Sequence, residues 1–162
     1  MIDTLPFFEW LDTSALASIA KSYGGVFAVV QMFHLLAMAM LGGMVLLGDL
    51  RLLNLLLKSV PSEQVIEQTH RWFGYALIVA ILSGTFMASA VAMKLYYNES
   101  FWVKMTSLFA GIVFVYAIRT PLLRFQHSSI NPWALKALAV TSMLLWFTVA
   151  WRLRRVPLMP RG

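Results

Sequence analysis

The chain has 162 residues, of which 60% are apolar and only 12% are charged. A soluble domain has about 25% charged residues, because it presents a polar surface to water. The composition therefore indicates a membrane protein. The net charge of +6 does not indicate nucleic-acid binding, because lysine and arginine flank the apolar blocks and form no single basic patch. With no cysteine, the chain has no disulfide, thiolate metal site or cysteine-ligated iron–sulfur cluster.

The N-terminal segment, residues 6–21, has the pattern of a short amphipathic helix. Its apolar residues recur at helical spacing, and Pro6 suits a first helical turn. We expect this helix to lie in the membrane interface. The segment lacks the basic start and apolar run of a secretory signal. Gly24 and Gly25 then allow the chain to turn into the first apolar block.

Four apolar blocks follow, each with the roughly 20 residues that a helix needs to cross about 30 Å of hydrocarbon. They predict an all-α fold, an integral membrane four-helix bundle that forms a single membrane domain over residues 1–162. We expect the first helix to continue beyond its span towards Lys58, and Asn131 with Pro132 to begin the last helix. The predicted spans are residues 26–47, 72–93, 101–118 and 133–151.

Aromatic and basic residues support these boundaries. Trp72, Trp102 and Trp133 lie near the starts of spans, where amphipathic rings favour the headgroup layer. Basic residues are divided almost evenly between the two sides, with a dense cluster after residue 151. Because basic segments stay on the cytoplasmic side, this cluster predicts that both termini are cytoplasmic.

One stripe of the first span carries its polar and small residues at spacings of three and four. Such spacing puts them on one helix face, which we expect to contact protein. His34 lies about two turns inside the block, where lipid cannot satisfy its nitrogens. It is either a neutral histidine that hydrogen-bonds across helices, a haem or metal ligand, or a group with a proton or quinone role. The stripe consists of Gln31, His34, Met38, Gly42, Val45 and Asp49.

His70 and His127 are expected at the end of the bundle opposite to the start of the first span. Two histidines on neighbouring helices can hold a b-type haem, so His34, His70 and His127 are haem-ligand candidates. His34 and His127 start from opposite faces, about 30 Å apart, and are not expected to share one iron. Ordinary interfacial histidines beside arginines are the alternative. Candidates to neutralise haem propionates are Arg71, Arg119 and Arg124.

Other polar residues of the first helix allow further interpretations. His34 with Met38, one turn away, is a weaker candidate for a soft copper site, although methionine commonly fills gaps in apolar packing. Asp49 and Arg51 are structural polar candidates where the helix leaves the membrane. We expect them to be solvated, or to pair with Arg71, Arg119 or lipid headgroups.

The sequence lacks the motifs of a self-contained enzyme. It has no recognisable nucleophile–base pair, paired carboxylates within spans, phosphate-binding glycine loop or HExxH motif. Our leading hypothesis is a non-catalytic membrane subunit or redox partner with optional haem b. The alternatives are a structural accessory subunit of a larger membrane complex and a copper-handling protein. The expected partners are membrane lipid and other membrane subunits or a second copy, with no nucleic acid.

The order of these features resembles a family of uncharacterised small bacterial membrane proteins over roughly residues 7–125. The amphipathic lead is followed by QMFHLLAMAMLGGMVLLGDLRLLN, HRWFGYALIVAILSG and YYNESFWVKMTSLFAG. That family is similar to the membrane domain of copper-resistance (CopD-type) proteins, which are multi-helix bundles with histidines in their first helices. The resemblance rests most on His34 and on the run from Gly48 to Leu52. It implies a helical bundle in the bacterial inner membrane, and no activity.

This sequence departs from the family pattern at two positions. An acidic residue often precedes the first-helix histidine by three positions in that pattern, and here Gln31 occupies the place. A histidine often closes the third helix, where this chain has Ile118 and Arg119. Both departures argue against transferring a metal site from the family.

Overall fold

The computed structural model describes residues 4–121 and 131–151. Every regular element in these ranges is a helix, which confirms the all-α prediction. Three helical segments are long and apolar enough to cross a membrane: α3 (Gly24–Leu52), the part Glu63–Ala90 of α4 (Ser62–Ala90), and Glu99–Arg119. The last segment joins α6 (Glu99–Val113) to the π-helix η1 (Phe114–Arg119). Helix α8 (Pro132–Trp151) has a shorter apolar stretch, Trp133–Phe147.

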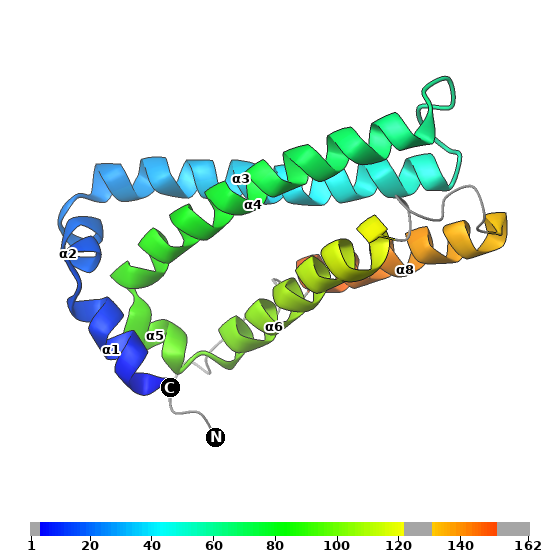
Figure 1. The fold of residues 1–162 in the computed structure, drawn as a ribbon. Coiled ribbons are helices and arrows are strands. Elements are labelled where there is room, and N and C mark those ends of the chain that lie inside the picture. Colours follow the sequence, from blue (N-terminus) through cyan, green and yellow to red (C-terminus); the bar gives the residue numbers. More distant parts are fainter. Residues whose placement is uncertain (1–3, 122–130, 152–162) are drawn as a thin grey trace, which may run out of the picture.

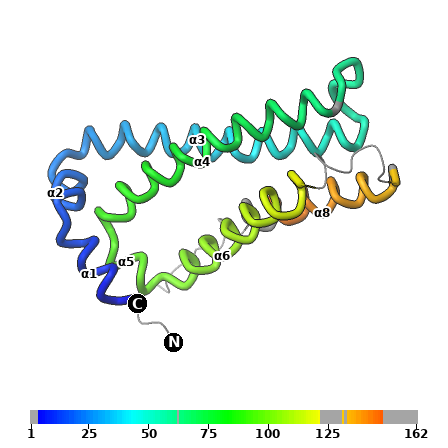
Figure 2. The backbone as a smooth tube through the Cα atoms, viewed as in Figure 1, coloured from blue at the N-terminus to red at the C-terminus, as the bar shows by residue number. Residues whose placement is uncertain are grey.

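The helices form two groups that meet at one end of the molecule. Helices α3 and α4 run antiparallel and side by side, and α8 packs against both α3 and α6 (Figures 1 and 2). Away from that end, α6 diverges from the α3–α4 pair. The main apolar core lies where α3, α4 and η1 come together, and its buried residues are Ala37, Leu41, Val45, Phe73, Ala76, Ala80 and Val115.

The N-terminal segment predicted as one helix forms two, α1 (Leu5–Thr13) and α2 (Ala15–Ser22). Ser14 between them is extended, and its hydroxyl accepts a hydrogen bond of 3.2 Å from the backbone N–H of Ala17. A serine that caps the following helix in this way competes with helix continuation. Helix α1 packs Phe8 and Leu11 against α5 (Ala92–Tyr96), so the segment forms an angled cover over one end of the helices.

Helix α3 ends at Leu52, before the predicted continuation towards Lys58. Asn54 and Leu57 take positive φ angles of 58° and 54°, which a continuing right-handed helix does not allow. Nε and Nη2 of Arg51 donate to the carbonyl of Val60 at 3.0 and 2.8 Å. Arg51 therefore holds the loop between α3 and α4 and does not remain a solvated helix end.

Helix α8 begins as predicted. The side-chain oxygen of Asn131 accepts a hydrogen bond of 3.0 Å from the backbone N–H of Trp133. This contact satisfies one of the free N–H groups of the first turn.

Candidate functional site

The most unusual feature of the structure is an ion pair inside the apolar interior. Oδ1 of Asp49, on α3, lies 3.0 Å from Nη2 of Arg119, at the end of η1, and the two side chains are 0% and 8% exposed. Taking such charges out of water costs several kcal/mol per ion, so the two groups depend on each other. The expectation of a solvated Asp49 is wrong, because η1 and α8 pack over the last turn of α3. The alternative expectation, pairing with Arg119, is what the structure has.

Gly48 makes room for this ion pair. A Cβ atom at this position would collide with Nη2 of Arg119. The guanidinium therefore lies across the backbone of α3 beside Asp49. No other residue type fits here without moving the arginine, which accounts for the glycine directly before the aspartate.

The π-helix η1 turns Arg119 towards α3. The hydroxyl of Thr120 donates to the carbonyl of Val115, five residues earlier, at 2.7 Å. A π turn is wider than an α turn, and it changes the face on which the following residues lie. Arg119 is 7% exposed as a result, while Ile118 beside it remains 48% exposed.

Helix α8 also contributes to the site. Ser142 is fully buried and interacts with the carboxylate of Asp49. Within the described residues, neither the carboxylate oxygens nor Nε and Nη2 of Arg119 make a well-aligned hydrogen bond, and the same holds for the hydroxyl of Ser142. The contact between Asp49 and Arg119 is therefore mainly a charge pair. The packing of α3, η1 and α8 holds it in place.

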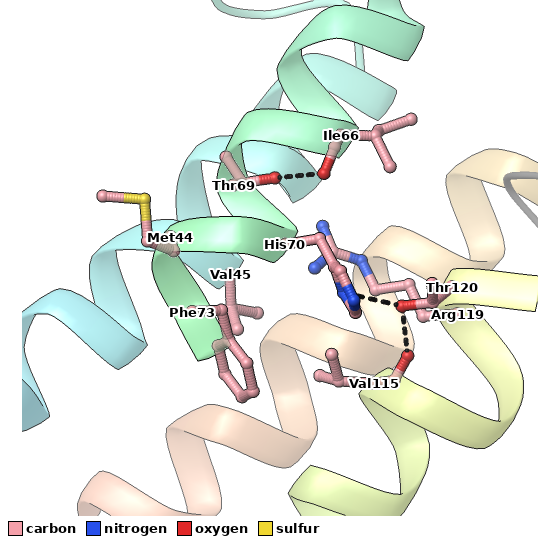
Figure 3. Close-up of a pocket in the computed structure, with 9 residues that line it drawn as sticks. All are labelled: Met44, Val45, Ile66, Thr69, His70, Phe73, Val115, Arg119 and Thr120. Atoms are coloured by element: carbon pink, nitrogen blue, oxygen red, sulfur yellow. Dashed lines mark hydrogen bonds between the residues drawn. The ribbon is translucent and has the colours of Figure 1, made fainter. Parts of the chain in front are cut away.

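His70 lies close to the ion pair (Figure 3). Its Nδ1 is 3.1 Å from Oγ1 of Thr120. The single hydroxyl proton of Thr120 is used on Val115, so Nδ1 of His70 is the donor in this contact. The His70 ring also meets the ring of Tyr116 edge-on at 5.1 Å. These contacts join α4 to the end of η1.

His70 and Arg119 both line a small cavity. It has a volume of about 10 Å³ and is closed on the α3 side by Met44 and Val45 (Figure 3). A cavity of this size holds about one water molecule.

His34 lies far from this site and has a different partner. Its Nδ1 is 3.0 Å from Oγ of Ser83 on α4. The Ser83 hydroxyl donates to the carbonyl of Val79, so His34 is again the donor. Ser83 follows His70 on α4 by more than three turns, which is about 20 Å. His34 and His70 therefore cannot bind the same iron.

The structure places the remaining predicted site residues as follows. Gln31 is exposed on α3. Met38 packs against the main apolar core. Arg71 is exposed and pairs with Glu67 at 3.4 Å. Arg124 and His127 lie outside the described residues.

The cofactor hypotheses therefore stay predictions. The haem pair of His70 and His127 includes a residue outside the described ranges. Arg119, a propionate candidate, already pairs with Asp49. The described residues contain no group of three or more His, Asp or Glu that could hold a metal ion. The pair of His34 with Met38 stays a prediction.

Four residues that position the polar contacts were not identified as site residues from the sequence. Ser83 and Ser142 are hydroxyls within apolar blocks, the same signal that singled out His34. The role of Gly48 follows only from its contact with Arg119. Thr120 had no recognisable signal, because its position depends on the π turn before it.

The comparisons with known proteins give one match. A family described as a family of unknown function (DUF6644) matches residues 7–158. No curated protein and no solved structure matches the chain. The resemblance to an uncharacterised family is thereby confirmed. The further likeness to copper-resistance proteins and the bacterial origin receive no support from these comparisons and stay predictions.

Proposed function

The chain belongs to this family of unknown function, and since the family supplies no activity, we propose from the geometry that the protein is a non-catalytic integral membrane subunit. In this role it forms a helical scaffold that packs against a larger membrane assembly. The observation that carries the proposal is that polar side chains in the interior join one helical element to another. Contacts of this kind hold helices together in membrane proteins. The contacts are Asp49 with Arg119, His34 with Ser83, and His70 with Thr120.

The exposed surface supports a place in the membrane. In the most apolar windows of the three long segments, only 17%, 22% and 17% of the residues are buried. The rest is apolar surface far larger than a soluble monomer exposes. Lipid or the apolar face of another membrane subunit would cover it.

The interior supports a role without catalysis. The cavity beside the ion pair has a volume of about 10 Å³, whereas sites for small molecules have volumes of about 300–1,000 Å³. The arginine nearest to this cavity is already paired with Asp49. The polar groups at this point of the fold therefore suit a structural role better than the binding of a substrate.

Cysteine labelling tests the membrane placement. The chain has no native cysteine, so a maleimide can label only the single cysteine that each variant introduces. Ala39 is exposed near the middle of α3, and Asn54 is exposed in the loop after it. In membrane vesicles opened to both sides, we expect a water-soluble maleimide to label Asn54→Cys but not Ala39→Cys. Both variants should be labelled after denaturation, and equal labelling before it would contradict the placement.

The same variant tests the orientation. If both termini are cytoplasmic, the loop after α3 faces outwards. Asn54→Cys should then be labelled in intact cells by a reagent that does not cross the membrane.

Copurification tests the role as a subunit. We expect the tagged chain, extracted from its native membrane in a gentle detergent, to elute with a partner in fixed stoichiometry as a particle clearly larger than the 18.3 kDa chain in detergent. A tagged membrane protein of similar hydropathy from the same membrane is the control and should not bring down that partner. A lone monomeric particle in the first preparation would exclude the role.

A further inference from the structure

An open groove lies between the end of α3, the loop that follows it and the start of α4. Its volume is about 360 Å³, within the range of sites that bind small molecules. Met44 and Leu47 form the wall on α3, and Leu57 and Val60 form the wall on the loop. The groove is distinct from the ion-pair site, although Met44 and Thr69 border both.

The groove changes from polar to apolar along α4. Its lining on α4 extends from Gln64 to Trp72, a length of about 12 Å in a helix. Gln64 and Gln68 lie in the first part, whereas the long apolar stretch of α4 begins at Trp72. In the proposed membrane placement, on which this step rests, one end of the groove lies among headgroups and the other in hydrocarbon. Its occupant is therefore amphipathic.

The polar lining suits an uncharged head with oxygen atoms. Gln64 and Gln68 are one turn apart and lie on the same face of α4. Each amide can donate to a carbonyl or accept from a hydroxyl. Glu67 also borders the groove, and its charge is balanced by Arg71 at 3.4 Å. The lining thus favours hydrogen bonds to neutral groups over the binding of an ion.

Trp72 adds a flat aromatic surface at the apolar end of the groove. Its side chain borders the groove and is 49% exposed. The ring of Tyr75 meets its indole edge-on at 5.9 Å, which restrains the orientation of the indole. An exposed indole held in this way can stack against another planar ring.

We propose that this groove binds a membrane quinone, with the ring against Trp72, the ring carbonyls accepting from the amides of Gln64 and Gln68, and the tail along the apolar wall of Met44 and Leu47. A quinone combines the three required properties, a planar ring, uncharged carbonyl oxygens and a hydrocarbon tail. The proposal concerns binding alone and includes no redox step.

Fluorescence quenching tests the proposal. The purified full chain is reconstituted into lipid nanodiscs, and decylubiquinone is added as the probe. We expect saturable quenching of the tryptophan fluorescence of the protein. The control for collisional quenching is a free tryptophan derivative added to nanodiscs that contain no protein. Trp72→Phe should remove this saturable part. The same exchange at Trp133, which is 77% exposed on α8, should leave it unchanged.

A matched pair of amide variants tests the contacts with the quinone carbonyls. Gln68→Leu keeps the bulk of the side chain and removes its hydrogen bonds. One net hydrogen bond corresponds to a loss of about threefold to tenfold in affinity. Gln31→Leu makes the same exchange at an exposed amide of α3 outside the groove lining and should bind as the wild type does. Leu47→Phe, which narrows the groove without adding a tryptophan to the fluorescence signal, should weaken saturable binding.

Three results would overturn the proposal: no saturable quenching in the wild type, equal affinity of the Gln68→Leu and Gln31→Leu variants, or displacement of the probe by an equal mole fraction of diacylglycerol. The last result would identify a neutral lipid as the occupant. These results are independent of copurification. If cysteine labelling supports the membrane placement and quinone binding fails, only the quinone proposal is lost.

Discussion

Replacing Arg119 with methionine is expected to lower the free energy of unfolding by about 3–5 kcal/mol, because the substitution leaves the charge of Asp49 buried without a partner. The carboxylate is 0% exposed and its only charged contact in the described residues is the guanidinium at 3.0 Å. Reversible unfolding in mixed detergent, followed by circular dichroism, measures the change. The matched control is Arg71→Met. That arginine is 58% exposed in a surface pair, and its loss should cost less than about 0.5 kcal/mol.

A double variant separates the cost of an unpaired charge from the value of the pair. Asp49→Leu combined with Arg119→Met removes both charges and replaces them with apolar side chains of similar size. Exchanges of this kind are often neutral or stabilising, so we expect the double variant to recover most of the stability that Arg119→Met loses. If the double variant is as unstable as the single one, the side chains contribute through their shape, and the charge-pair interpretation is wrong.

Gly48→Ala is expected to destabilise the protein by roughly 1–2 kcal/mol, because the cost of displacing a buried guanidinium exceeds the gain of up to about 1 kcal/mol that alanine brings to a helix interior. The added methyl group would collide with Nη2 of Arg119 and displace the guanidinium from Asp49. The matched control is Gly43→Ala on the same helix, where an added Cβ meets nothing within 4 Å. In a helix interior that control should be neutral or stabilising by up to about 1 kcal/mol. The same unfolding measurement reports both variants.

The origin of the Gly48 effect can be tested in the background of Arg119→Met. If the methyl group acts by displacing the guanidinium, Gly48→Ala should cost much less once the guanidinium is absent, since the two sites are in contact and their effects are not additive. An unchanged cost in that background would mean that the methyl group disturbs the helix backbone itself.

The stripe on the first helix predicted only part of the face of α3 that is buried. Val45 is buried as the stripe predicted, and Asp49 is buried although a solvated helix end was also expected, but Gln31 and Gly42 are exposed. The side of α3 that packs instead includes Ala37 and Leu41. The stripe was predicted from its polar and small residues. The face of α3 that is buried depends instead on the shape of the α4 surface that packs against it.

The polar contacts also depend partly on the local sequence and partly on how the helices pack. The depth of His34 in an apolar block indicated that it needed a partner, and the structure has one in Ser83. Its identity depends on how far α4 is shifted along α3. The burial of Arg119 depends on the π turn before it, and its pairing with Asp49 on the rotation of η1 against α3.

By itself, the sequence determined that this protein is all-helical, that its helices are long and apolar, and that His34 is unusual in such surroundings. These properties follow from composition and block length, which describe each helix against its solvent. Only the tertiary structure decided that Asp49 pairs with Arg119 over Gly48, that His34 and His70 have separate partners, and that a groove opens beside Trp72. Each of these depends on the relative rotation and shift of two helices, which side-chain packing sets and no local pattern encodes.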